Sequence, residues 1–119
     1  MKILIIDDNE VILDSIMSFL KRHGYDILYA ANGAYALKIL EENSVNLIIT
    51  DLMMPDMDGY EFCQMIRHNK KFKNLPIIVS TAKSDHESRE FLQKLEVKNF
   101  LTKPYSSESL LNAVKGCLS

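Results

Sequence analysis

The sequence predicts an α/β fold in which a parallel sheet is covered by helices on both faces. Five short apolar runs alternate with five longer amphipathic segments. The runs are almost continuously apolar, as expected for strands that are covered on both sides. Strict alternation implies parallel strands joined by right-handed crossovers, and five such units are too few for an eight-stranded barrel. We therefore expect a doubly wound, flavodoxin-like sheet of five parallel strands in the order 2-1-3-4-5, with five helices.

The first part of the chain contains three predicted strands and two predicted helices. Apolar residues at helical spacing over 11–20 predict the first helix, with Asp8 or Asn9 as its N-cap and Gly24 just past its end. Asn32 can cap a second helix that continues to Asn43. The predicted strands in this part are 2–6, 26–31 and 46–50.

The second part of the chain contains two predicted strands, 76–80 and 99–102, and three predicted helices. A loop over 52–59 leads into the third helix at about residues 60–69. Ser84 and Glu87 have the spacing of a capping box and open a fourth helix that ends near residue 95. The last helix starts at Ser106 or Ser107.

Composition narrows the class of protein. The chain has 119 residues, 47% of them hydrophobic, and a net charge of −2, so we expect one globular domain over 1–119. A pI near 5.9 argues against direct nucleic-acid binding. No apolar run could span a bilayer or serve as a signal peptide, so we expect no membrane insertion and a cytoplasmic protein. Cys63 and Cys117 are isolated, which predicts two reduced, partly buried thiols.

Polar residues follow the predicted strands where their carboxyl ends meet at one edge of the sheet. Asp7 and Asp8 follow the first strand and Asp51 follows the third. Ligands bind at this edge in parallel sheets. Three carboxylates close together repel one another, and a hard divalent cation such as Mg²⁺ removes that repulsion. The alternative for Asp7 and Asp8 alone is a solvated acidic turn that caps the first helix.

Two further side chains end strands at the same edge. Thr81 ends the fourth strand and Lys103 follows the fifth, next to Pro104. Taken one at a time, these residues are also compatible with a structural ion pair and a solvated threonine. As a set with a carboxylate nucleophile and a metal, they suit phosphoryl transfer onto Asp51, because the cations neutralise charge on the transferring group.

The residues then match a known family. The chain resembles the receiver domain of bacterial two-component response regulators over essentially its whole length. The matching segments 3–9, 48–59, 76–82 and 100–105 have the sequences ILIIDDN, IITDLMMPDMDG, PIIVSTA and FLTKPY. The resemblance implies that the chain accepts a phosphoryl group from a phosphohistidine on a sensor histidine kinase or a phosphotransfer protein. It also implies a downstream protein target, and a signalling switch rather than an enzyme beyond its own phosphorylation and dephosphorylation.

The resemblance assigns the metal ligands. Asp51 would be the phosphoacceptor and would hold Mg²⁺ together with the backbone carbonyl of Met53. Asp8 would be a direct ligand, with Asp7 acting through water.

The resemblance also assigns the switch residues. Thr81 would be the switch hydroxyl and Phe100 the switch aromatic, although an aromatic residue on a short strand is usually part of a core. Lys103 would contact the phosphoryl group, and the Lys103–Pro104 peptide bond would be cis.

Two positions depart from the family pattern. Glu96 and Val97 stand where the family often has Gly-Ala, and glycine suits a left-handed helix end better than glutamate does. We therefore expect a differently shaped end of the fourth helix. Ser80 occupies a position that is frequently apolar.

Three rival functions remain to be weighed. A flavin or nucleotide enzyme would need a phosphate loop rich in glycine, or in serine and threonine, after the first strand, and the chain has acidic residues there. An aspartyl phosphatase would need a second aspartate where Met53 stands. A receiver-like interaction module that is not phosphorylated usually lacks one of the acids, the threonine or the lysine, and this chain keeps them all. This module is the alternative to a phosphorylated switch.

Overall fold

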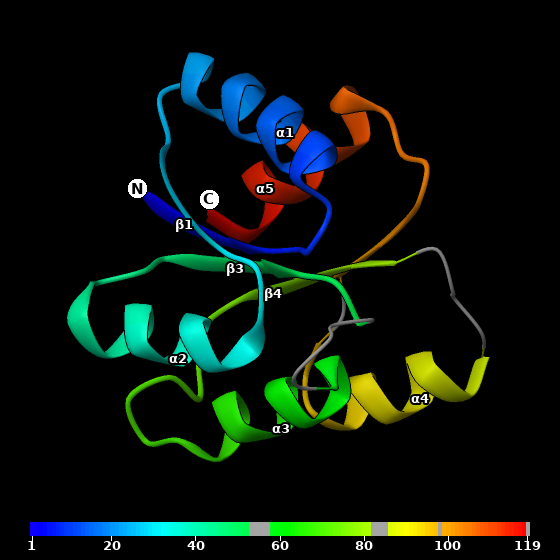
Figure 1. Cartoon of the computed structure of the whole chain (residues 1–119). Helices are drawn as coiled ribbons and strands as arrows, with labels where there is room; N and C mark the ends of the chain where they lie inside the picture. The colour runs from blue at the N-terminus through cyan, green and yellow to red at the C-terminus, as the bar shows by residue number, and fades with distance from the viewer. Residues whose placement is uncertain (53–57, 82–85, 98, 119) are drawn as a thin grey trace.

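Five parallel strands form one sheet in the order β2-β1-β3-β4-β5, which confirms the predicted order (Figure 1). The computed structural model describes residues 1–52, 58–81, 86–97 and 99–118. The strands are β1 (Lys2–Ile6), β2 (Asp26–Ala30), β3 (Leu47–Thr50), β4 (Ile77–Thr81) and β5 (Asn99–Thr102). The helices in the described ranges are α1 (Glu10–Arg22), α2 (Gly33–Glu42), α3 (Gly59–His68), α4 (His86–Lys94) and α5 (Ser107–Leu118).

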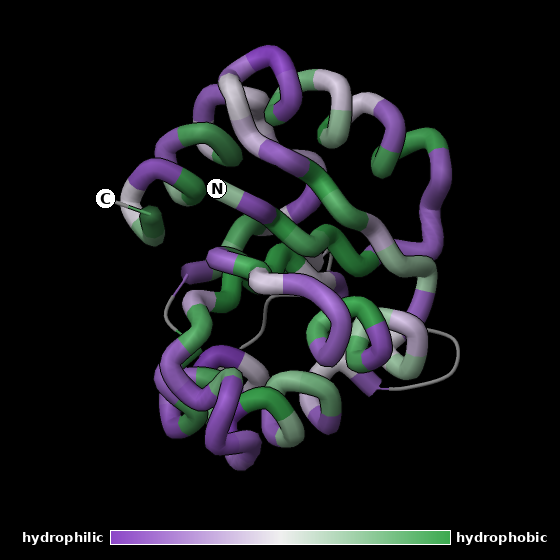
Figure 2. The backbone as a smooth tube through the Cα atoms, turned by 90° about the vertical axis from the view of Figure 1, so that its left-hand side faces the viewer, coloured by the Kyte–Doolittle hydropathy of each residue, from purple (hydrophilic) through white to green (hydrophobic). Residues whose placement is uncertain are grey.

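The helices form two layers, one on each face of the sheet. Helices α1 and α5 cover one face, and α2, α3 and α4 cover the other (Figure 1). Each face has its own apolar core, because strand residues alternate between the two sides: Ile3 and Ile5 pack towards α1 and α5, whereas Leu4 and Ile6 pack towards α2 and α3. Figure 2 shows hydrophobic segments across the middle of the molecule and hydrophilic residues on the outer turns of the helices.

Burial of the strands follows their place in the sheet. Every residue of the central strands β3 and β4 is buried, as the continuous apolar runs predict. The edge strands β2 and β5 contain exposed and half-buried positions, and each has one buried residue. None of the helices in the described ranges has the length and apolar composition needed to cross a membrane. Both cysteines are free thiols; Cys117 is half-buried, as predicted, whereas Cys63 is fully buried, deeper than predicted.

Short polar side chains start the helices at the carboxyl edge of the sheet. Asn9 is the N-cap of α1, and its Oδ1 accepts hydrogen bonds from the Val11 and Ile12 amides at 3.2 and 3.3 Å. Asn32 caps α2 in the same way, through a 2.8 Å bond from the Tyr35 amide. Of the two residues proposed as caps for the first helix, Asn9 is the one that serves. The predicted capping box at Ser84 lies outside the described residues.

Helices α1 and α4 end in the same turn with different residues. In each, a left-handed residue follows the helix: Gly24 has φ 90° and Glu96 has φ 60°. After α1 the Gly24 amide donates to the Lys21 carbonyl, and after α4 the Glu96 amide donates to the Gln93 carbonyl. A second bond closes each turn, from the amide of the next residue back to the helix, which is the Schellman pattern. The expectation of a differently shaped end for the fourth helix is therefore wrong.

Arg67 explains why a glutamate is held in this turn. Its guanidinium donates to the carbonyl oxygens of Leu95 at 2.6 Å and of Glu96 at 3.4 Å, both in the turn after α4. It also donates to Leu75 at 2.7 Å and Lys73 at 3.2 Å, in the segment before β4. These bonds join two connections at the amino ends of neighbouring strands, so tertiary contacts fix a conformation that local preference disfavours.

Candidate functional site

The site is built at the carboxyl ends of two neighbouring inner strands, β1 and β3. Asp7 directly follows β1 and Asp51 directly follows β3, its neighbour in the sheet. Backbone hydrogen bonds extend the sheet through both residues: the Asp7 amide donates to the Ala30 carbonyl and the Asp51 amide to the Ile6 carbonyl, each at 3.1 Å. The two side chains are therefore carried on rigid backbone. Asp7 is 5% exposed and Asp51 is 8% exposed.

Asp8 completes a cluster of three carboxylates. Asp7, Asp8 and Asp51 each place one oxygen so that the three oxygens lie within 4.8 Å of one another, and Asp8 is exposed to solvent. An all-oxygen donor set with one open side fits a hard divalent cation that keeps part of its water shell. The structure thus brings together the three side chains predicted as metal ligands. Met53, the predicted backbone ligand, lies outside the described residues.

Lys103 reaches the same cluster from the end of β5. Its Nζ donates to Asp7 Oδ2 at 2.7 Å and to Asp51 Oδ2 at 3.0 Å. Burial alone lowers the pKa of Lys103, but the hydrogen bonds and the charges of both carboxylates outweigh burial, and the pKa of Lys103 is raised. The ammonium is therefore firmly protonated at neutral pH and balances part of the negative charge. The peptide bond between Lys103 and Pro104 is cis, as the resemblance implies.

Gly59 sets how closely helix α3 approaches the segment after Asp51. The Gly59 amide donates to the Leu52 carbonyl at 3.0 Å. A β-carbon at this position would lie 2.5 Å from Leu52 Cα and 2.7 Å from the Asp51 carbonyl oxygen. Both are backbone atoms, so any other residue would push α3 away or displace the Asp51 backbone.

Thr81 and Phe100 lie on the side of the sheet that faces α4. Thr81 is the last residue of β4 and is 2% exposed. Phe100 pairs in register with Val79, two residues before Thr81, so Val79, Thr81 and Phe100 face the same side. The Phe100 ring packs against the core between the sheet and α2–α4. Both predicted switch residues therefore lie on the α4 side of the sheet. Thr81 is at the carboxyl end of its strand, and Phe100 is further from the carboxyl ends of the strands.

Arg89 was not singled out from the sequence. Its guanidinium carbon lies 5.3 Å from the centre of the Phe100 ring, which is the geometry of a cation–π contact. The contact joins the predicted switch aromatic to helix α4. An arginine on an amphipathic helix is usually a solvated surface residue, and only the packing of α4 beside β5 reveals its partner.

The arrangement can bind a divalent cation and stabilise a phosphoryl group. Two buried carboxylates, one exposed carboxylate and a lysine ammonium converge at one edge, with a buried threonine at the end of the next strand. A carboxylate nucleophile flanked by cations is suited to phosphoryl transfer, because positioning and charge neutralisation supply most of the catalysis.

Comparisons with known proteins agree with this chemistry. The family model "Response regulator receiver domain" matches residues 3–115. The chain is 35% identical over 115 residues to protein PilG of Pseudomonas aeruginosa, covering 97% of the chain and 85% of PilG. It is 36% identical over 117 residues to the alkaline phosphatase synthesis transcriptional regulatory protein PhoP of Bacillus subtilis, covering 98% of the chain but 48% of PhoP.

A solved structure gives the same picture. The chemotaxis response regulator CheY4 of Vibrio cholerae superposes with a TM-score of 0.91 at 30% identity, covering 98% of each chain. Similarity to PilG and CheY4 thus extends over most of each protein, whereas similarity to PhoP is limited to about half of that regulator.

Proposed function

The chain belongs to the receiver domains of response regulators, which act in two-component signalling, and on this premise we propose that Asp51 is its phosphoacceptor. The phosphoryl group would come from a phosphohistidine of a histidine kinase or a phosphotransfer protein. The observation that carries the proposal is the double hydrogen bond from Lys103 Nζ to Asp7 and Asp51, beside the exposed carboxylate of Asp8. We propose that the whole of residues 1–119 forms this receiver domain.

Transfer needs one bond to form and one to break. A carboxylate oxygen of Asp51 forms a bond to phosphorus while the bond from phosphorus to the donor nitrogen breaks, and the imidazole keeps the electron pair. Asp7, Asp8 and Asp51, with the backbone carbonyl of Met53, would hold Mg²⁺. When bound, this ion neutralises charge on the phosphoryl oxygens and on the carboxylates. Asp7 and Asp51 are set on the sheet backbone, so the acceptor is oriented before the donor arrives.

Lys103 and Thr81 would then hold the product. At rest the Lys103 ammonium bonds to Asp51, and the same ammonium is placed to bond to a phosphoryl oxygen on that carboxylate. Thr81 supplies a hydroxyl at the end of the neighbouring strand. Phosphorylation adds about two negative charges at this edge, and new bonds to Lys103 and Thr81 are the response that the geometry favours. Phe100, through its contact with Arg89, would carry that response to α4.

The output would be a changed protein-binding surface. We propose a switch that promotes only its own Mg²⁺-dependent phosphorylation and dephosphorylation, and that turns over no separate substrate. With a net charge of −2 the chain lacks the excess of positive charge that is typical of nucleic-acid-binding domains, so its target is proposed to be a downstream protein. We propose that it acts in the cytoplasm.

The test uses a small phosphodonor. Folded protein incubated with Mg²⁺ and acetyl phosphate should show a slower band on a phosphate-affinity gel. Asp51→Asn should abolish the band and keep the fold, because the amide is nearly isosteric but not nucleophilic. Asp14→Asn, which removes an exposed acid of α1, is the matched control and should behave like the wild type. A folded wild-type chain that stays unphosphorylated would contradict the proposal and favour the unphosphorylated interaction module.

A further inference from the structure

Two hydroxyl groups near the site are buried without a hydrogen-bond partner. Ser80 is 3% exposed, and neither its Oγ nor the hydroxyl of Tyr105 makes a hydrogen bond of ordinary geometry to the described part of the chain. A buried hydroxyl without a partner is unfavourable and needs an explanation. Phosphoryl transfer as proposed above uses neither residue.

The two side chains lie on the same face of the sheet, because Ser80 pairs in register with Leu101 and Tyr105 packs against the core that contains Leu101. Burial raises the pKa of Tyr105, and the adjacent Ser80 hydroxyl lowers it in part, as does Lys103, whereas Asp7 and Asp51 raise it further. The net pKa of Tyr105 is raised, so its hydroxyl stays protonated at neutral pH and is able to donate. One hydrogen bond between the two oxygens would satisfy both groups.

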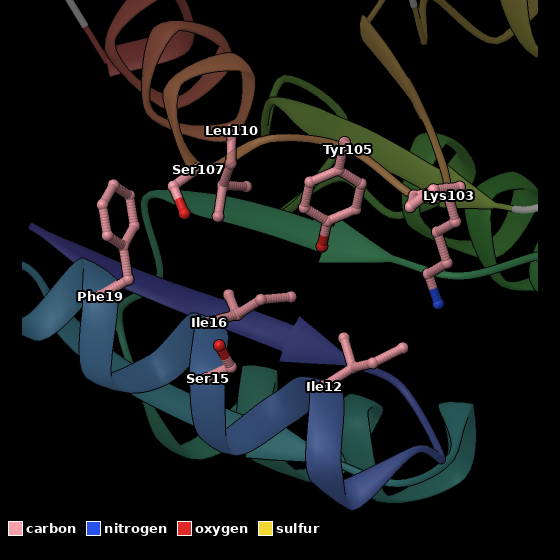
Figure 3. A pocket seen from close by; sticks show the side chains of 9 residues that line it. Ile12, Ser15, Ile16, Phe19, Lys103, Tyr105, Ser107 and Leu110 are labelled. Carbon is pink, nitrogen blue, oxygen red and sulfur yellow. The ribbon is translucent and has the colours of Figure 1, made fainter.

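The Tyr105 ring is not packed on every side. The ring lines a cavity of about 440 Å³ between α1 and α5, with Ile12, Ile16 and Leu110 among the other lining residues (Figure 3). A side chain beside a cavity lacks packing partners on that side. A hydrogen bond to Ser80 would restrain the ring.

The same two segments are already joined at a second point. The Lys103 amide donates to the Thr81 carbonyl at 2.9 Å, which extends the pairing of β4 with β5. Ser80 directly precedes Thr81, and Tyr105 follows Lys103 by two residues. Because side chains alternate along a strand, Ser80 faces α5 while Thr81 faces α4. A Ser80–Tyr105 bond would therefore hold the β4 end and the Lys103 segment together from the opposite face.

We propose that the hydroxyls of Ser80 and Tyr105 form a pair that positions the Lys103 segment against the end of β4. Both are positioning residues, since they act on the phosphoryl group only through Lys103 and Thr81. The pair rests on the proposed function, because its role is to keep the Lys103 ammonium aligned with Asp51 during transfer.

The test is a double-variant cycle on the rate of phosphorylation by acetyl phosphate. Ser80→Ala and Tyr105→Phe should each slow phosphorylation about fivefold, the range expected for one hydrogen bond, and the double variant should be no slower than either single one. Ser80→Thr keeps the hydroxyl and should restore the rate. Tyr29→Phe removes an exposed phenol far from Lys103 in sequence and should leave the rate unchanged. The proposed pair would be contradicted if the single variants were phosphorylated at the wild-type rate. It would also be contradicted if the two losses of rate multiplied in the double variant.

A second readout does not depend on phosphorylation. Titration of the Tyr105 ring carbon signals by NMR should give a higher pKa for Tyr105 in Ser80→Ala than in the wild type, because the variant lacks the hydroxyl that lowers it. An unchanged pKa of Tyr105 would overturn the pair even if phosphorylation proceeds normally. A wild-type chain that accepts no phosphoryl group would contradict the proposed function, and the titration would still decide whether the two hydroxyls interact.

Discussion

Lys103 and Arg67 are two partly buried cations that lie at opposite ends of the strands. Lys103 has charged partners, whereas Arg67 has neutral backbone partners. Lys103, at the carboxyl ends of the strands, bonds to two carboxylates, and its pKa is raised. Arg67, near the amino ends, bonds to carbonyl oxygens of two connections, and burial lowers its pKa although Cys63 and Glu96 raise it in part. A charged side chain that bonds to other charged side chains can exchange partners during a reaction. A charged side chain that bonds to backbone carbonyls holds those segments of the backbone in place. The carboxyl edge is therefore built for chemistry and the amino edge for stability.

The largest effect on stability is expected at the amino edge. Arg67→Ala should lower the free energy of unfolding by about 3 kcal/mol, because four hydrogen bonds are lost and the carbonyls of Leu75 and Leu95 lose the donor that Arg67 supplies. Urea denaturation measures this change. Arg22→Ala, at an exposed position near the end of α1, should cost less than about 0.5 kcal/mol. Equal losses of unfolding free energy in Arg67→Ala and Arg22→Ala would contradict the stabilising role given to the amino edge.

Replacing the cation at the other edge should have a smaller effect that depends on metal. Lys103→Met should lower the free energy of unfolding by about 1–2 kcal/mol, because Asp7 and Asp51 then face each other without a counter-charge. Mg²⁺ should stabilise this variant more than it stabilises the wild type, since no ammonium competes for the carboxylates. Thermal unfolding with and without Mg²⁺ checks both statements, with the exposed Lys115→Met as control. A loss that Mg²⁺ does not reduce would count against a metal site at this edge.

The smallest effect concerns the two turns that end α1 and α4. Glu96→Gly should raise the free energy of unfolding by about 0.5–1 kcal/mol, because glycine adopts a positive φ without strain, and Gly24→Ala should lower it by about 1 kcal/mol. Glu96→Gln keeps the β-carbon and should change little. Urea denaturation of the three variants is sufficient. A destabilised Glu96→Gly would mean that the carboxylate, rather than Arg67, holds the turn.

The fold and most of the site follow from local signals in the sequence. Apolar runs and their alternation with amphipathic segments predict the strand order, and the rule that ligands bind at the carboxyl ends of parallel strands brings Asp7, Asp51 and Lys103 together. These predictions succeed because each depends on one segment and one topological rule. Whether Phe100 acts as a switch stays a prediction, since an aromatic on an edge strand packs in the core in either case.

What the sequence could not provide depends on contacts between distant segments. Arg67 joins the connections before β4 and β5, and no pattern within either connection indicates a donor from α3. For the same reason the turn at Glu96 was predicted incorrectly: local preference disfavours glutamate at positive φ, and the tertiary bonds from Arg67 outweigh it. The contact of Arg89 with Phe100 likewise exists only once α4 lies beside β5.

The most direct measurement of the central claim is a pair of ¹H–¹⁵N NMR spectra, recorded before and after addition of Mg²⁺ with beryllofluoride, which mimics a phosphoryl group on Asp51. We predict shifts at Asp51 and Thr81 and, through the contact between Phe100 and Arg89, in helix α4. Asp51→Asn should show none of the shifts beyond the acidic cluster. Changes confined to Asp7, Asp8 and their neighbours in the wild type would contradict the account, because they would show a bound ion without a switch.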